Sequence, residues 1–148
     1  MSRTKIDLPS EFAFSTDIPI RIGDINRGMH LGHDSFLLIM EEARTRFLRS
    51  LGYVENNIEG AGLIMTDVSI VYLRQGKYGQ TLKVEIAISD FTTRSFDMLY
   101  RVSDRDTGVE MARAKTGFVF YDYQKQKMVA VSPSLKGKLQ TKTGGDQT

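Results

Sequence analysis

The chain has 148 residues, of which 41% are hydrophobic and 26% are charged, and its formal net charge is +2. This composition fits one globular domain, excludes a wholly disordered, collagen-like or coiled-coil chain, and gives no reason to expect a nucleic-acid partner. The chain has no cysteine, which excludes disulfides, thiolate metal sites and cysteine nucleophiles.

The predicted elements begin after an irregular N-terminal arm over residues 1–14. A strand is expected over 18–23, and the clearest element is a helix over 35–51. Apolar side chains recur along this helix every three or four residues, which places them on one face. They are Phe36, Met40, Ala43, Phe47 and Leu51. Asp34 is the predicted N-cap, and Gly52 is the predicted glycine after the C-terminal end.

The rest of the chain favours strands, because apolar and polar residues alternate between turn-forming segments. The expected strands cover 63–73, 82–89, 96–102 and 110–123. Consecutive strands joined by short turns are antiparallel. We therefore expect an α+β domain over 15–135, with one antiparallel sheet packed on one long central helix. Residues 136–148 are polar and are expected to form a flexible C-terminal tail.

The segment over residues 23–36 concentrates the chemically useful side chains. It holds both histidines of the chain, His30 and His33, and leads into the predicted helix. A helix start offers unpaired N–H groups and about half a positive charge, which can polarise a carbonyl and hold an oxyanion. Gly32 allows close approach of a ligand to the backbone. The alternative interpretation is that the glycines shape a tight connection and the histidines are ordinary loop residues.

Other chemistries are weaker for this segment. His30, His33 and Asp34 could supply metal ligands, but their spacing matches no closed zinc site. The chain also lacks the Gly-x-Ser-x-Gly elbow of serine hydrolases and the phosphate-binding loop of nucleotide-binding proteins.

The sequence DINRGMHLGHDSF over residues 24–36, followed by MEEAR over 40–44, resembles the motif of the hot-dog fold acyl-CoA thioesterases. The nearest pattern is that of the 4-hydroxybenzoyl-CoA thioesterase-like family. Two later segments agree with it: YLRQGKYG over 72–79 resembles a turn of that family, and TRSF over 93–96 resembles the start of one of its strands. The resemblance covers about residues 16–133.

This resemblance implies a hot-dog fold, in which the sheet wraps around the helix. It also implies a homodimer or homotetramer with sites at subunit interfaces. The implied reaction is hydrolysis of an acyl-coenzyme A, with no metal and no cofactor other than the coenzyme A of the substrate. No membrane partner is expected, since no apolar run approaches the roughly 20 residues of a spanning helix. The first residues lack the apolar core of a secretory signal, so we expect a cytoplasmic protein.

The resemblance also assigns site residues. The catalytic carboxylate of the family falls at Asn26, and an amide cannot act as a base. Asp24, two residues earlier, remains acidic, and His30 occupies a position at which related plant acyl-carrier-protein thioesterases carry a histidine. The backbone N–H of His33 matches the family's oxyanion donor. Together these residues are expected to polarise the thioester and to orient or activate water.

The remaining candidates lie further along the chain. Glu42 is a candidate supporting residue, although Glu41 and Glu42 could equally form a solvated pair beside Arg44, Arg46 and Arg49. The residues expected to bind substrate are Gly32, Asp34, Arg74, Lys77, Arg94 and Ser95. The three basic side chains of this set lie in or beside turns, where they could hold phosphates, or they could serve only surface solubility.

Three functions remain open at this point. The first is an acyl-CoA thioesterase. The second is a hot-dog module that binds an acyl-CoA but turns it over weakly or not at all, because the usual carboxylate is absent. A dehydratase acting on a 3-hydroxyacyl thioester is the third, and the loop pattern favours the thioesterases over it.

Overall fold

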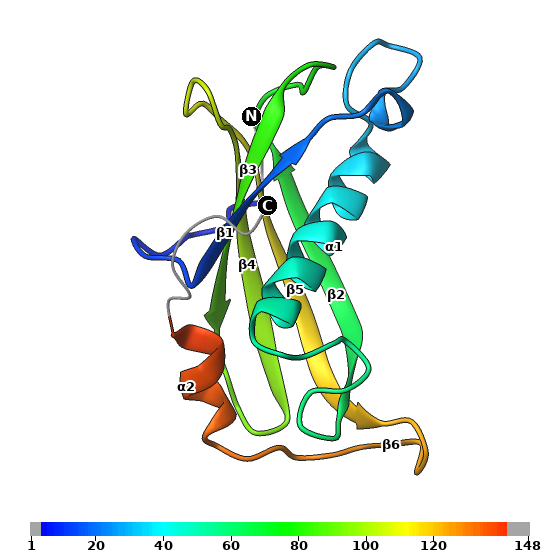
Figure 1. Ribbon diagram of the computed structural model, residues 1–148, viewed down its shortest axis with the longest axis vertical. Coiled ribbons are helices and arrows are strands. Elements are labelled where there is room, and N and C mark those ends of the chain that lie inside the picture. The colour runs from blue at the N-terminus through cyan, green and yellow to red at the C-terminus, as the bar shows by residue number, and fades with distance from the viewer. Residues whose placement is uncertain (1–3, 142–148) are drawn as a thin grey trace.

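An antiparallel sheet and one long helix form the two main layers of the structure, a computed structural model that describes residues 4–141 (Figure 1). The elements are β1 (Phe14–Pro19), the short 3-10 helix η1 (Ile22–Asp24), α1 (His33–Ser50), β2 (Gly62–Tyr72), β3 (Thr81–Ser89), β4 (Ser95–Asp104), β5 (Glu110–Asp122), β6 (Lys127–Met128) and α2 (Leu135–Gln140). The order of strand, helix and four further strands, and with it the α+β fold class, is confirmed.

The sheet has the strand order β1-β3-β4-β5-β2, with β6 attached to β5, and every pairing is antiparallel. Strands β3, β4 and β5 follow one another as the sequence suggests. Strand β2 instead pairs with β5 and does not touch β3, because the connection over 73–80 crosses from one side of the sheet to the other. Adjacency of consecutive strands is a tendency of chains and not a rule.

Helix α1 lies against one face of the sheet (Figure 1). Its apolar stripe faces inward. Phe36, Met40 and Phe47 are buried there together with Tyr100 and Phe120 of the sheet. At its C-terminal end, the N–H groups of residues 52 and 53 donate to the carbonyls of residues 49 and 48. This is a Schellman ending, which requires the positive φ of the glycine at residue 52.

The helix begins two residues earlier than expected. Its N-cap is Gly32, which has no side chain to cap with, so the prediction of Asp34 as N-cap is wrong. Asp34 lies in the first turn instead, where a carboxylate is favourable near the positive end of the helix dipole.

The ends of the described chain pack on opposite faces of the sheet. Ile6 in the N-terminal segment is buried on the face away from α1, and its carbonyl accepts a hydrogen bond from Arg113. Residues 135–140 form α2, with Leu135 and Leu139 fully buried against the core. The prediction of a flexible tail is therefore wrong for residues 136–140, because this pair of leucines anchors a helical turn. The part of that prediction covering 142–148 lies outside the described residues. No helix within residues 4–141 is long and apolar enough to cross a membrane.

Candidate active site

Asn26 holds the loop before α1 in a tight turn. Its backbone N–H donates to the carbonyl of His30 at 2.8 Å. Its side-chain oxygen accepts the N–H of Gly28 at 2.9 Å and that of His30 at 3.3 Å. Because both contacts come from N–H donors, the side-chain atom that they share must be the amide oxygen and not the nitrogen. The oxygen is thus committed to the turn, and the NH2 group is the part of the side chain left for a ligand.

The first turn of α1 carries the unpaired N–H groups. The N–H of Gly32 donates to the carbonyl of Asp24 at 3.0 Å, and those of Ser35 and Phe36 donate to the carbonyl of Gly32. Within residues 4–141, the N–H groups of His33 and Asp34 have no hydrogen-bond acceptor. A Cβ at residue 32 would come within 2.6 Å of the Asp34 carboxylate. Glycine at this position therefore keeps the helix start open to a ligand.

The connection between β2 and β3 supports this loop from behind. The N–H of Leu31 donates to the carbonyl of Gly76 at 2.7 Å. A Cβ at Gly76 would lie 2.9 Å from the Leu31 side chain and 3.2 Å from that of Ile20. The backbone at residue 76 therefore approaches the loop before α1 so closely that only glycine fits there. This contact joins the two loops, which lie at the top of the molecule in Figure 1.

The two loops and the helix start enclose an open cavity of about 590 Å³. Its lining residues are Asn26, His30, Leu31, His33, Phe36, Tyr72, Leu73, Arg74 and Gln75. Four of the predicted site residues, Asn26, His30, His33 and Arg74, thus meet in one place. The His30 imidazole lines this cavity. Its Nδ1 atom is buried and has no hydrogen-bond partner in the described chain, so solvent in the cavity does not reach that nitrogen.

Tyr72 is a further residue of this cavity, and it is not among the predicted site residues. Its ring stacks on the imidazole of His33 with centroids 4.3 Å apart, and its hydroxyl donates to the His33 carbonyl at 3.1 Å. Burial raises the pKa of the Tyr72 hydroxyl, and the nearby Asp34 carboxylate raises it further. The hydroxyl therefore stays protonated and remains a donor at neutral pH. The signal was present in the sequence, because Tyr72 opens the YLRQGKYG segment that already pointed to this family.

Asp24 and Glu42 lie elsewhere. They line a second cavity of about 240 Å³, which shares no residue with the first. The Asp24 carboxylate accepts the N–H of Arg21 at 2.8 Å, and Glu42 pairs with Arg46 at 2.8 Å. Asp24 falls at the end of η1 and not on an extended strand, so it does not share a face with Asn26.

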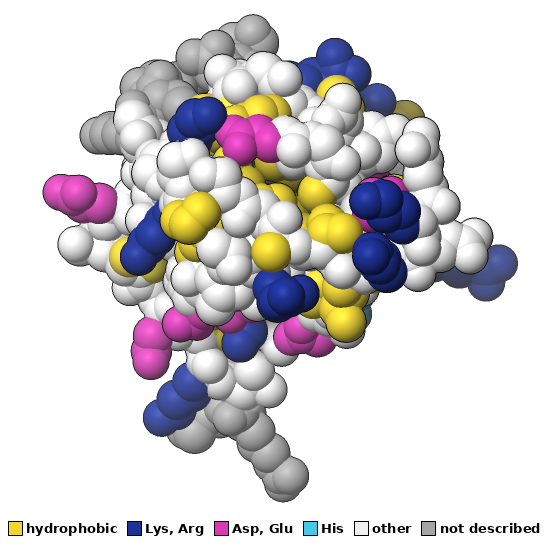
Figure 2. Space-filling model, turned by 90° about the horizontal axis from the view of Figure 1, so that it is seen from below, with side chains coloured by type: hydrophobic (Ala, Val, Ile, Leu, Met, Phe, Trp, Pro, Cys, Tyr) yellow, Lys and Arg dark blue, Asp and Glu magenta, His cyan; other side chains and the backbone are white. Residues whose placement is uncertain are grey.

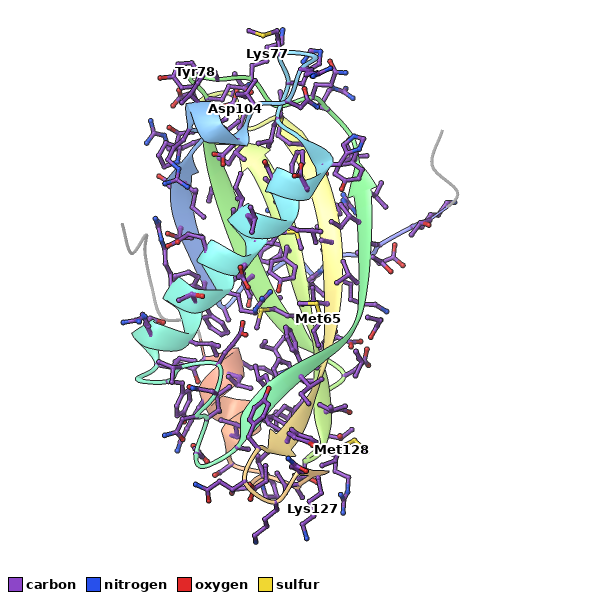
Figure 3. All side chains as sticks on the ribbon, turned by 90° about the vertical axis from the view of Figure 1, so that its right-hand side faces the viewer. Met65, Lys77, Tyr78, Asp104, Lys127 and Met128 are labelled. Atoms are coloured by element: carbon purple, nitrogen blue, oxygen red, sulfur yellow. The ribbon has the colours of Figure 1, made fainter. Side chains whose placement is uncertain are left out.

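The other predicted binding residues are distributed over both ends of the molecule. Gly32 and Asp34 lie at the helix start, and Lys77 is exposed at the same end (Figure 3). Arg94 and Ser95 lie at the opposite end, with Arg94 in the turn between β3 and β4 and Ser95 at the first position of β4. Figure 2 shows that end, where Lys and Arg side chains are mixed with hydrophobic ones. One copy of the chain therefore does not bring Arg94 and Ser95 to the cavity.

The donor set offers no evident metal site. Within residues 4–141, no group of three or more His, Asp or Glu side chains is arranged to hold a metal ion. The cavity instead offers backbone N–H groups, one amide NH2 group and an imidazole, which together can polarise a carbonyl and move a proton.

Comparison with known proteins places the chain among thioesterases. The family model of the Thioesterase-like superfamily matches residues 20–139. YneP of Bacillus subtilis (strain 168), whose name describes it provisionally as an acyl-CoA thioesterase, is 27% identical over 77 residues, which cover 51% of this chain. The match spans about half of that relative, 56% of its length.

Solved structures share the fold. Slr0204 from Synechocystis, a 1,4-dihydroxy-2-naphthoyl-CoA thioesterase, is 20% identical with a TM-score of 0.77, and the match covers 85% of this chain and 94% of Slr0204. A DHNA-CoA thioesterase from Staphylococcus aureus is 17% identical with a TM-score of 0.74, covering 84% of this chain and 86% of that one. These similarities confirm the hot-dog architecture expected from the sequence.

Proposed function

The chain belongs to the thioesterase-like superfamily, and from this premise we propose that it hydrolyses an acyl-coenzyme A to a carboxylic acid and free coenzyme A. The observation that carries the proposal is the meeting of three features in one cavity. They are the unpaired N–H groups at the start of α1, the NH2 group of Asn26 and the imidazole of His30.

In this proposal, the thioester carbonyl docks against the N–H of His33. As water attacks, negative charge develops on the carbonyl oxygen, and a fixed N–H donor at a helix start stabilises it without reorganisation. A single donor of this kind contributes on the order of 10²–10³ in rate in other hydrolases. The backbone carbonyl of Asp24 supports this geometry by holding the N–H of Gly32 at 3.0 Å.

The attacking water is positioned by Asn26 and deprotonated by His30. The NH2 group of Asn26 donates to the water oxygen, and the imidazole takes one proton as the oxygen bonds to the carbonyl carbon. When the tetrahedral intermediate collapses, the carbon–sulfur bond breaks and the same proton passes to the coenzyme A sulfur. Glu42, which is bound to Arg46 outside the cavity, has no direct part in this reaction.

Coenzyme A carries phosphates, and basic side chains are suited to them. Arg74 lines the cavity and Lys77 lies at the same end of the molecule. We assign both to the phosphate-bearing part of the substrate. We propose that the reaction needs no metal and no further cofactor, and that the protein is cytoplasmic.

We further propose that the protein acts as a homodimer or homotetramer through the open edge of β2. Within residues 4–141, β2 is an 11-residue edge strand. Met65, Val68 and Tyr72 along it are 38–40% exposed although they pair with buried residues of β5. Exposed apolar edges are prone to pair with another strand. Antiparallel pairing of two β2 strands would turn the Arg94 and Ser95 end of the second copy toward the cavity of the first.

A hydrolysis screen tests the reaction. The purified protein is offered short-chain, long-chain and aromatic acyl-CoAs, and thiol release is measured. We expect turnover that falls at least tenfold, about 1.4 kcal/mol of barrier, in both Asn26→Ala and His30→Ala. Asn57→Ala is a matched control, because the Asn57 side chain also holds a turn, through the N–H of Gly60 at 3.0 Å, in another loop. Binding of every ester without hydrolysis would instead support the binding module.

A further inference from the structure

We propose that Tyr72 is a positioning residue: it fixes His33 on the sheet so that the His33 N–H faces the thioester carbonyl. This inference rests on the proposed function, since it names a residue that acts on the same site through His33.

Tyr72 contacts the first helical residue in two ways. Its ring stacks on the imidazole of His33 at 4.3 Å with an interplanar angle of 28°, and its hydroxyl donates to the His33 carbonyl at 3.1 Å. The ring of Phe36, one turn further along α1, meets Tyr72 edge-on at 5.3 Å. One side chain therefore restrains the main chain and the side chain of the residue that carries the proposed oxyanion donor.

The helix start depends on such a contact because it lacks a cap. Gly32 occupies the N-cap position and forms no side-chain hydrogen bond, and uncapped helix ends fray. A Ser or Asp at this position would cap the helix but would place a side chain over the N–H groups. Tyr72 instead holds the first turn from the side and leaves those N–H groups open.

Tyr72 can act as a restraint because its own backbone is firmly held. It pairs with Ala112 at the end of the β2–β5 ladder. The N–H groups of the next two residues, Leu73 and Arg74, both donate to the carbonyl of Met111. The Tyr72 side chain thus ties the first residue of α1 to a firmly held part of the sheet. The hydroxyl is a donor to a carbonyl and takes no proton in the cycle, so we expect its loss to leave the pH profile unchanged.

Two variants separate the ring from the hydroxyl. Tyr72→Phe keeps the stack on His33 and is expected to lower kcat about threefold. Tyr72→Leu removes both contacts and is expected to lower kcat at least tenfold, with KM within twofold of the native value and the same pH–rate profile. Tyr53→Phe is the matched control. It also loses a phenol hydrogen bond, to Glu59 at 2.6 Å, but beyond the far end of α1, and it should keep the native kcat.

Amide hydrogen exchange gives a readout that does not depend on activity. We expect exchange at Ser35 and Phe36, whose N–H groups donate to the carbonyl of Gly32, to accelerate in Tyr72→Leu and to stay native in Tyr53→Phe. Faster exchange in a protein that hydrolyses no acyl-CoA would refute the reaction but not the contact. A native kcat in Tyr72→Leu would overturn the positioning role while leaving the thioesterase intact, and so would a loss confined to KM.

Discussion

Replacing Tyr100 by phenylalanine is expected to destabilise the protein by about 2–4 kcal/mol. The Tyr100 hydroxyl is fully buried, accepts a hydrogen bond from Arg44 at 3.2 Å and shares one with Thr116 at 2.8 Å. Burial raises the pKa of Tyr100, so the group lost is a neutral hydroxyl. A hydrogen bond to a charged partner contributes roughly 1.5–3 kcal/mol and a neutral one roughly 0.5–1.5 kcal/mol.

The large magnitude follows from the burial of both partners. Arg44 is only 4% exposed, lies over the ring of Phe118 and pairs with Glu55. Phenylalanine would leave a guanidinium N–H and the Thr116 hydroxyl unsatisfied where water cannot replace the lost partner. The helix, the sheet and the loop after α1 meet at this network, so we expect the whole domain to lose stability.

Urea unfolding followed by far-ultraviolet circular dichroism measures the change, because the chain has no tryptophan. Protein concentration is held constant to keep any association equal. Tyr78→Phe is the control, since Tyr78 is 64% exposed and its hydroxyl makes no hydrogen bond within residues 4–141; its effect should stay within about 0.5 kcal/mol. A loss below about 1 kcal/mol in Tyr100→Phe would refute the reasoning. Thr116→Val in both backgrounds should show coupling of roughly 0.5–3 kcal/mol.

Three further changes test the site and the sheet. Asn26→Asp should keep the turn, because a carboxylate accepts the same two N–H groups, and hydrolysis should then rise with pH as the carboxyl ionises; a collapse of the thermal midpoint would contradict this. Gly32→Ala should lower kcat at least tenfold while costing less than about 1 kcal/mol in urea, because the new Cβ presses on the exposed Asp34 side chain at the open helix start. Asp97→Asn should raise stability at pH 7 but not near pH 3, as thermal scans at both values would show. Burial first, then the charges of Asp90 and Asp67, raise the pKa of Asp97 against the opposing effect of Lys115, so its ionisation costs stability as pH rises through the raised folded-state pKa.

Local pattern was enough to predict most elements. The apolar stripe of α1 and the alternation in β3 and β5 depend only on neighbouring residues, and those elements were found within a few residues of their ends. The first strand was placed at 18–23 but runs over Phe14–Pro19. The reason is that η1 interrupts the apolar run, so Ile22 is exposed in a turn while Phe14 is buried at the strand start.

Contacts between distant segments could not be predicted in the same way. The residues around Tyr72 do not indicate that its side chain contacts His33, 39 residues earlier in the chain. Nor does the sequence of β2 indicate that this strand pairs with β5 and not with β3, the next strand along the chain. Arg44 is an instructive intermediate case. From the sequence it is named only beside the pair Glu41 and Glu42, yet it lies four residues after Met40 and so falls on the buried face. The spacing of Arg44 from Met40 indicates burial, whereas a charged side chain is usually exposed.

In the C-terminal segment, too, the spacing of the residues indicates burial while the overall polarity indicates exposure. Leu135 and Leu139 are four residues apart, which is the spacing of one helical face. A domain boundary at residue 136 separates the two leucines and leaves a segment with only one apolar residue, Leu139. Both are fully buried, so a pair of apolar side chains outweighs the polar residues between them when a groove of the core is available.

Asparagine at position 26 cannot act as the base, so another group in the site must take that role. Its oxygen is used by the Gly28 and His30 N–H groups, so the side chain can offer the cavity only donors. A donor can orient water or share in holding an oxyanion, but it cannot take a proton. In the proposed reaction, the proton passes to the imidazole of His30, which also lines the cavity. We therefore propose a division of roles in which the amide of Asn26 organises the loop and orients the water, and the imidazole of His30 acts as the base.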